Sequence, residues 1–257
     1  MKNQVIPPKS SCQSGHQGGN ALIIILVTIA LLVGLTLMIT RLSSKTTGNI
    51  NSEQARMMAE SIMRTAQTYE GSVQRLMNVN RCSENELNFD NTETVVSYDN
   101  TGAPSNGRCD LYGVEGAGLS YTPPNPDFLD PSRSAKTQYG EWAFYGTQCI
   151  LEVGDGDTTC GDAEIDLMMN LPHIRRDICI EINNLNGITN PSGEPPTEEH
   201  NNSGLGFKGA YSVGTGDPEI GEGVSGAELI RNTTGCFEDN AGAWAGSYIF
   251  YHVLLVR

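Results

Sequence analysis

The chain has 257 residues, seven of them cysteine, and a formal net charge of −14 at pH 7. This charge is unevenly placed, because the first 40 residues contain Lys2 and Lys9 and no acid, whereas all 30 acidic residues follow. Nucleic-acid binding depends on clustered Lys and Arg, so the composition excludes nucleic acid as a partner of the bulk of the chain. Residues 41–257 are numerous enough to bury a substantial core.

An uninterrupted apolar stretch lies close to the N-terminus. Residues 21–40 carry no charge and are dominated by Leu, Ile and Val, with Thr28, Thr36 and Thr40 as polar exceptions. About 20 such residues in a helix span the roughly 30 Å hydrocarbon core of a bilayer, whereas a helix on the surface of a soluble protein needs a polar face. The sequence therefore predicts a transmembrane helix at residues 20–40, with the membrane as a partner.

Six cysteines follow the apolar stretch, and Cys12 precedes it. An even set of cysteines suits disulfide bonding in an oxidising compartment. We therefore predict a cytoplasmic N-terminus and an acidic extracytoplasmic domain at residues 82–257. Spacing does not fix the connectivity, although a Cys149–Cys160 bridge would close a hairpin tip; the disulfide candidates are Cys82, Cys109, Cys149, Cys160, Cys179 and Cys236.

A second helical pattern is expected within residues 41–81. Its first part, residues 41–49, is polar with one glycine, so the first helix could bend or break there. Beyond Ser52, apolar residues recur at steps of three or four and predict one buried helix face, made of Ala55, Ala59, Ile62, Ala66, Tyr69, Val73 and Leu76. We expect this stripe to pack against a sheet formed later in the chain.

Short apolar or aromatic segments between turns predict strands after Cys82. The candidate strands span residues 94–98, 118–121, 140–153, 178–182 and 247–256. Residues 163–172 suit a short helix or a strand, and residues 171–184 could instead contain a helix with Cys179 on its inner face. The apolar segment 247–256 favours an inner strand.

Residues 185–235 are rich in Gly, Pro, Asn and Glu and poor in bulky apolar side chains. They predict a long surface excursion, partly disordered and held by Cys236. The expected fold class is α+β: a transmembrane helix continuing into an amphipathic helix, packed on an antiparallel sheet with long disulfide-stapled loops.

The polar leader ends in Gln17-Gly18-Gly19, directly before the apolar stretch. This arrangement resembles the class III signal of type IV pilin-like proteins. The resemblance implies a cytoplasmic leader at residues 1–19, cut between Gly19 and Asn20 by a leader peptidase, with the apolar helix retained. The chain departs from the family at Asn20, usually aromatic, and at Ile24, usually glutamate. Without cleavage, residues 20–40 would be an ordinary single-pass anchor.

Two other segments, residues 179–184 and 246–257, together with the start of the apolar stretch, resemble a group of uncharacterised bacterial membrane-anchored proteins with such N-termini. This second resemblance implies an architecture and no activity.

Sequence motifs for catalysis are absent. The four histidines, His16, His173, His200 and His252, lack zinc-ligand spacing, and the chain has no Gly-x-Ser-x-Gly elbow or Walker A loop. We therefore expect neither an enzyme nor a resident cofactor. Calcium is the one metal considered, because carboxylate oxygens on a loop suit it; its candidate ligands are Asp155, Asp157, Asp162 and Asp166, with Glu164 nearby. We expect these residues to form a solvated hairpin tip, with a calcium site as the alternative.

The resemblance favours a structural role. It implies a pilin-like or pseudopilin-like subunit held in the bacterial inner membrane, which assembles with identical or related subunits into a filament or secretion-type pseudopilus. The C-terminal domain would then be periplasmic or displayed on the filament. The alternative is an uncut, single-pass anchored domain that binds a protein or glycan through residues 185–235.

Overall fold

The computed structural model describes residues 20–154, 159–199, 206–213, 219–222 and 226–257; within α1 it describes the side chains of residues 23–31 and of those from 51 on. The chain divides into two compact units, Met1–Asn51 and Ser52–Arg257. Helix α1 (Asn20–Asn78) belongs to both units, and its backbone is helical through residues 41–49, the segment where the sequence allowed a bend or a break. Helix α2 (Arg176–Asn186) and all the described strands belong to the second unit.

The prediction of a transmembrane helix is contradicted. Among the residues that the structure describes, no helix is both long enough and apolar enough to cross a membrane.

The apolar stripe predicted on the second part of α1 is confirmed. All seven of its residues are buried, and Ala59, Ile62 and Val73 are completely inaccessible. They share the main core with Phe144 and Phe250 among others. Helix α1 therefore contributes one face of Ser52–Asn78 to the interior of the second unit.

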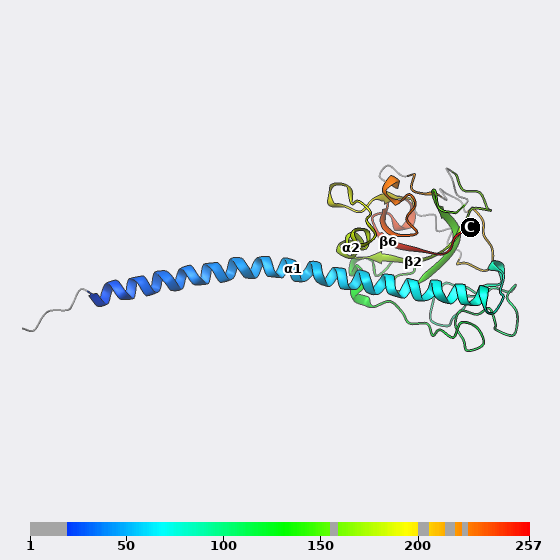
Figure 1. The fold of residues 1–257 in the computed structure, drawn as a ribbon, viewed down its shortest axis with the longest axis horizontal. Helices are drawn as coiled ribbons and strands as arrows, with labels where there is room; N and C mark the ends of the chain where they lie inside the picture. The colour runs from blue at the N-terminus through cyan, green and yellow to red at the C-terminus, as the bar shows by residue number, and fades with distance from the viewer. Residues whose placement is uncertain (1–19, 155–158, 200–205, 214–218, 223–225) are drawn as a thin grey trace, which may run out of the picture. The chain divides into compact units, whose positions relative to one another are not determined.

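The strands form one six-stranded sheet with the order β3-β5-β6-β2-β1-β4. Four strands form its antiparallel centre: β1 (Ala143–Ile150), β2 (Asp166–Ile174), β5 (Thr234–Asp239) and β6 (Tyr248–Leu255). Figure 1 shows β2 and β6 running side by side, as their paired register requires.

The two edge strands make the observed sheet mixed, whereas an antiparallel sheet was predicted. β3 (Thr197–Glu198) pairs parallel with β5, and β4 (Glu219–Ile220) pairs parallel with β1. Each pair is joined through a long connection, and no tight hairpin forces an antiparallel orientation. The predicted arrangement of a helix packed on an antiparallel sheet is therefore wrong.

The individual strand predictions had mixed outcomes. β1 lies within the predicted segment 140–153, and β6 lies within 247–256 and is an inner strand, flanked by β5 and β2. Of the two choices for residues 163–172, the strand is correct, and the alternative helix carrying a buried Cys179 is α2. Residues 94–98 and 118–121 form no strand; a single bridge joins Tyr112 to Leu119.

The segment 185–235 is more than a surface excursion. Its described part supplies both edge strands and the buried side chains of Ile188, Phe207, Ile220 and Leu229. These apolar residues are too widely spaced to form a periodic pattern, which is why the sequence alone indicated a loop. Residues 200–205, 214–218 and 223–225 lie outside the described part, so the expected partial disorder stays a prediction.

Three disulfides connect the six predicted cysteines. The expected Cys149–Cys160 bridge is confirmed, with Cα atoms 6.3 Å apart. Cys82 bonds to Cys109 across 5.8 Å between Cα atoms, shortly after α1 ends. Cys179 bonds to Cys236 across 5.4 Å and so joins α2 to β5.

Candidate functional site

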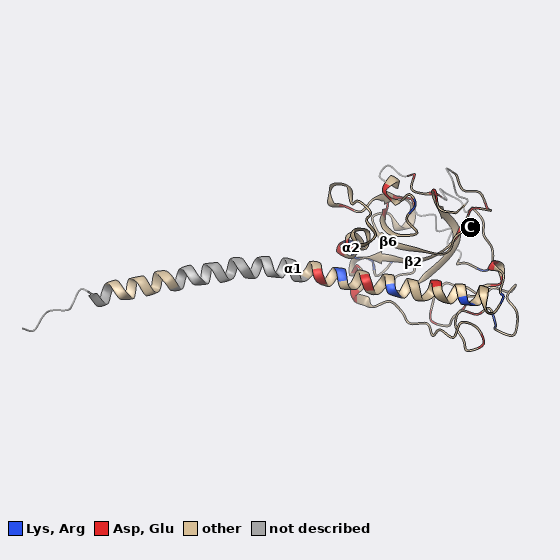
Figure 2. Cartoon of the chain, in the orientation of Figure 1, with Lys and Arg blue, Asp and Glu red and all other residues tan. Residues whose placement is uncertain are grey.

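The most unusual surface in the described part of the chain is the apolar segment of α1. Seven large apolar side chains between residues 23 and 31 are exposed, from 51% at Val27 to 65% at Leu31. Figure 2 shows no Lys, Arg, Asp or Glu on these turns, whereas both charge signs occur on α1 beyond Ser52. Since consecutive positions point around the whole helix, this segment is apolar on every side. We call residues 23–31 the apolar segment.

The one polar side chain described in the apolar segment is satisfied within the helix. The Thr28 hydroxyl lies 3.0 Å from the carbonyl oxygen of Ile24 and 2.9 Å from that of Ile25. A threonine that bonds to its own helix exposes its methyl group without a free donor. The apolar segment can therefore be covered by other apolar side chains without leaving a buried hydroxyl unpaired.

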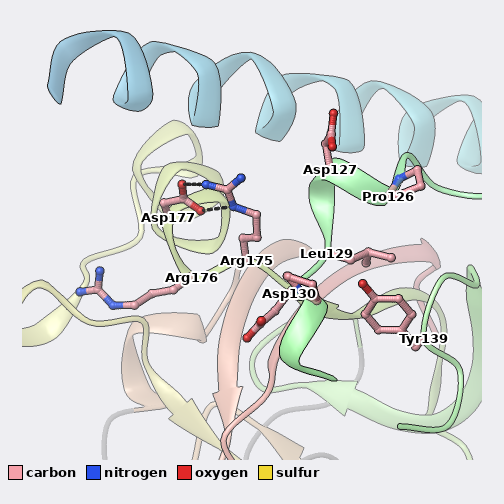
Figure 3. Close-up of a pocket in the computed structure, with 9 residues that line it drawn as sticks. Pro126, Asp127, Leu129, Asp130, Tyr139, Arg175, Arg176 and Asp177 are labelled. Carbon is pink, nitrogen blue, oxygen red and sulfur yellow. Dashed lines mark hydrogen bonds and ion pairs between the residues drawn. The ribbon is translucent and has the colours of Figure 1, made fainter. Parts of the chain in front are cut away.

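A second candidate is a groove of about 700 Å³ beside the start of α2 (Figure 3). Its apolar residues include buried Leu129 and the ring of Tyr139, and its charged residues come mostly from the turn into α2. The full lining is Pro126, Asp127, Leu129, Asp130, Pro131, Tyr139, Arg175, Arg176 and Asp177. The volume lies in the range of small-molecule sites.

The two arginines of the groove are already paired. Figure 3 shows Arg175 turned toward Asp177, with distances of 2.6 Å and 3.1 Å between their polar atoms, and Arg176 pointing away from this pair. Arg176 bonds instead to Glu194, which holds the pKa of that carboxyl below its ordinary value. No sequence pattern indicated this groove, although Asp177 before a run of apolar residues at helical spacing is a typical helix-start signal.

The calcium candidates are only partly described. Asp155 and Asp157 lie outside the described residues. The Asp162 carboxylate accepts the backbone N–H of Val213 at 2.7 Å, and the Glu164 carboxylate accepts that of Gly161 at 2.8 Å. In the part of the chain that the structure describes, no three His, Cys, Asp or Glu side chains are grouped as metal ligands would be. The described residues therefore do not test the choice between a solvated hairpin tip and a calcium site.

Asp166 has a different position from the one expected. It was predicted on a solvated tip, but it is the first residue of β2 and is completely inaccessible. Its carboxylate accepts backbone N–H groups from Ile150 at 3.2 Å and from Arg257 at 3.0 Å. Burial raises the pKa of Asp166 to about 7, against the opposing effects of these hydrogen bonds and of the Arg257 charge. Both carboxylate oxygens are therefore used as hydrogen-bond acceptors for backbone groups at one end of the sheet.

Two histidines are described, and both are structural. His252 was expected to be a hydrogen-bonded sheet residue, and it is one: its ring contacts Thr234 on β5 and Glu70 on α1. His173 lies 3.1 Å from the Ser247 hydroxyl and 3.0 Å from the carbonyl oxygen of Thr137. Burial lowers the pKa of both rings, which favours their neutral forms. His16 and His200 lie outside the described residues.

Comparison with known proteins adds no identity. No protein-family model, no curated protein and no solved structure matches the chain. The proposed processing residue Gly19 and the rest of residues 1–19 lie outside the described residues, whereas Asn20 is the first residue of α1.

Proposed function

We propose that the protein is a structural, pilin-like or pseudopilin-like subunit, which assembles through α1 with further copies or related subunits. The observation that carries this proposal is the apolar segment, whose seven large side chains are all more than half exposed. A helix that is apolar on every side is normally buried. Burying each such side chain contributes on the order of 1 kcal/mol or more, so several neighbouring helices would provide a strong drive toward assembly.

The two parts of α1 differ in their surfaces, and this difference supports assembly through the apolar segment. Beyond Ser52, one face of the helix is buried in the second unit and the opposite face is polar, as at Arg56 and Arg64. The apolar segment has no such polar face. We therefore propose that the apolar segment forms contacts between subunits, and that the second unit is displayed around them.

Processing and location are part of the same proposal. A leader peptidase would cut between Gly19 and Asn20, which leaves the helix start as the new N-terminus. Assembly would take place at the bacterial inner membrane, with residues 1–19 on the cytoplasmic side. The three disulfides support a periplasmic or surface location for the second unit, because such bonds persist in oxidising compartments.

The test is site-directed cross-linking in the native host. In a Cys12→Ser background, Val27→Cys places a thiol in the apolar segment, and Val114→Cys places one at a loop position that is 91% exposed. We expect oxidation of membrane or filament fractions to produce dimers linked through residue 27 and few linked through residue 114. Equal, low cross-linking at both positions would refute assembly through α1.

A charge in the apolar segment provides the second arm of this test. Ile25→Lys would place an ammonium group between packed helices, where an unpaired charge is costly. We expect this variant to lose the residue-27 cross-link while its second unit keeps all three disulfides. Met57→Lys, at a position that is 64% exposed on the folded part of α1, is the matched control and should assemble normally.

A further inference from the structure

Two asparagines of the sequence directly precede a glycine, and the fold places them in different surroundings. Asn106 lies in a turn with its side chain exposed and is followed by Gly107, whereas Asn186 is the last residue of α2 and is followed by Gly187. An asparagine before glycine is open to attack by the next backbone nitrogen, because glycine has no Cβ to hinder the approach. The surroundings of each pair then govern how readily it reacts.

The reaction in question needs no enzyme and only water as a co-reactant. The backbone nitrogen of the glycine attacks the Cγ atom of the asparagine side chain, and its proton leaves with the side-chain nitrogen as ammonia. The product is a succinimide ring, which water opens at either of its carbonyl groups. Opening gives aspartate or isoaspartate, in which the main chain runs through Cβ and Cγ. Both products replace a neutral amide by a carboxylate.

The Asn106 side chain is folded over the peptide group that would attack it. Its carbonyl oxygen Oδ1 accepts the backbone N–H of Arg108 at 3.2 Å, so Cγ is held on the side of the residue where the Gly107 nitrogen lies. The same hydrogen bond would stabilise the negative charge that develops on Oδ1 during the attack. The side-chain nitrogen makes no hydrogen bond within the described part of the chain, which leaves it free to depart as ammonia.

One backbone hydrogen bond must break before Gly107 can react. Its N–H donates to the carbonyl oxygen of Pro104 at 3.1 Å, across a turn whose residues Ser105 and Asn106 are exposed. Solvent-exposed backbone hydrogen bonds in loops open at low cost. Gly107 also has a φ of +72°, a conformation that glycine adopts and leaves without steric penalty.

Asn186 has the opposite arrangement. Here the side-chain nitrogen is the bonded atom: it donates to the carbonyl oxygen of Ile182 at 2.8 Å and lies 3.2 Å from the sulfur of Met63 on α1. In a helix the side chain is tilted toward the N-terminus, and therefore away from the backbone nitrogen of the following residue. Ring formation at Asn186 would require the last turn of α2 to unwind and these contacts to be lost.

We propose that Asn106 is a site of spontaneous conversion to aspartate and isoaspartate, and that the fold selects it over Asn186. The conversion adds one negative charge two residues before Arg108, whose guanidinium lies 3.6 Å from the Glu86 carboxylate. The new carboxylate therefore competes with Glu86 for this cation. The isoaspartate product also lengthens the main chain by one carbon atom and so rebuilds the turn.

The test compares two sites in the same molecules. The full chain, oxidised and folded, is incubated in mildly alkaline buffer made with ¹⁸O-labelled water, and peptides that cover residues 106 and 186 are followed by mass spectrometry with fragmentation that separates aspartate from isoaspartate. We expect residue 106 to convert at least about tenfold faster than residue 186, a modest share of the hundredfold or more that a fixed donor supplies in a buried active site. Each converted side chain should carry one labelled oxygen.

Unfolding and two variants provide the controls. In the reduced chain unfolded in urea, both asparagines should convert at similar rates, because both precede glycine and neither is held. Asn106→Gln should abolish the main acidic species that anion exchange separates from the aged protein, because the longer side chain closes its ring more slowly. Asn186→Gln, the matched variant, should leave that species in place.

Three results would overturn the proposal. The first is a folded chain in which residue 106 does not convert. The second is a folded chain in which residue 186 converts as fast as residue 106 or faster. The third is the same preference for residue 106 in the unfolded chain, which would mean that the neighbouring sequence, and not the fold, selects the site.

Discussion

At the scale of single residues, the Asn183 side chain makes hydrogen bonds to β5 that a neighbouring strand would otherwise make. Its side-chain amide donates to the carbonyl oxygen of Cys236 and accepts the N–H of the same residue, both at 2.9 Å. β3 meets β5 only at Glu238 and Asp239, so the earlier part of this β5 edge has no strand beside it in the described structure. The amide supplies the hydrogen bonds that a strand would supply, and buried peptide groups need such partners.

Removing this amide should therefore destabilise the fold. Asn183→Ala leaves the N–H and C=O of Cys236 buried without partners, at a cost of about 1–3 kcal/mol for each. We expect the free energy of unfolding in urea to fall by about 2–4 kcal/mol. Asn184→Ala, at an exposed position in the same helix, is the control and should change it by less than about 0.5 kcal/mol. Equal effects would contradict the role given to Asn183.

The pair of His252 and Glu70 makes a second residue-scale prediction. Burial lowers the pKa of His252, and the Glu70 carboxylate, 3.0 Å from its Nε2, partly opposes this effect. Glu70→Gln should therefore lower the pKa of His252 further. The change can be measured by NMR titration of the imidazole signals, with His173 as an internal reference that should not move.

The same pKa shift fixes the sign of the stability change. Because the folded state holds the His252 proton less tightly than the unfolded chain, stability from this residue is present above the unfolded pKa of about 6.5 and is lost as the pH falls toward the folded pKa. In Glu70→Gln this loss should extend to lower pH. A loss that ends at higher pH than in the wild type would contradict the opposing effect assigned to the Glu70 carboxylate.

At the scale of elements, we expect each disulfide to stabilise the fold according to the length of the loop that it closes. Cys179–Cys236 separates its partners by 57 residues in sequence, and Cys149–Cys160 by 11. The loop-entropy relation gives losses of about 4 and about 3 kcal/mol on removal. We therefore expect the Cys179→Ala/Cys236→Ala double variant to unfold at lower urea concentration than Cys149→Ala/Cys160→Ala. The opposite order would mean that local packing, not loop length, dominates.

Elements with strong local patterns could be predicted from the sequence. The stripe from Ala55 to Leu76 repeats at helical spacing, and the aromatic, β-branched segment at 247–256 became the inner strand β6. The two-residue strands β3 and β4 carry no pattern, because one backbone pairing each defines them. The reading of 178–182 as a strand was wrong because its apolar residues Ile178 and Ile182 lie one helical turn apart and fit α2 better.

The candidate sites were predictable to different degrees. The apolar segment is visible in the sequence, since its composition alone sets it apart. The groove depends on bringing the turn at 126–131 against the start of α2, a long-range contact that no local pattern encodes. The position of Asp166 was predicted wrongly because a cluster of acidic residues in the sequence indicates a solvated loop. Only the pairing of β2 with its neighbours reveals that the Asp166 side chain is buried.

At the scale of the whole molecule, the number of free thiols tests whether the leader at residues 1–19 is removed. The six cysteines beyond residue 81 are bonded in pairs, so Cys12 is the one cysteine of the sequence left over. Under denaturing, non-reducing conditions, we expect an uncut chain to take up one alkyl group and a chain cut after Gly19 to take up none. Mass spectrometry of protein from native membranes measures both the mass and the alkylation. A chain beginning at Asn20 that still takes up alkyl groups would contradict the disulfide pattern.

The bridge that follows α1 has a mechanical consequence. Cys82 comes four residues after the helix ends and is bonded to Cys109. Tension applied along α1 would therefore pass through this covalent link, and the residues between the two cysteines would not be drawn out. Each residue released by pulling adds roughly 3.3–3.6 Å of contour length, so the oxidised chain should extend markedly less than the reduced one. A subunit built this way would carry load through its helix while the loop between Cys82 and Cys109 is not extended.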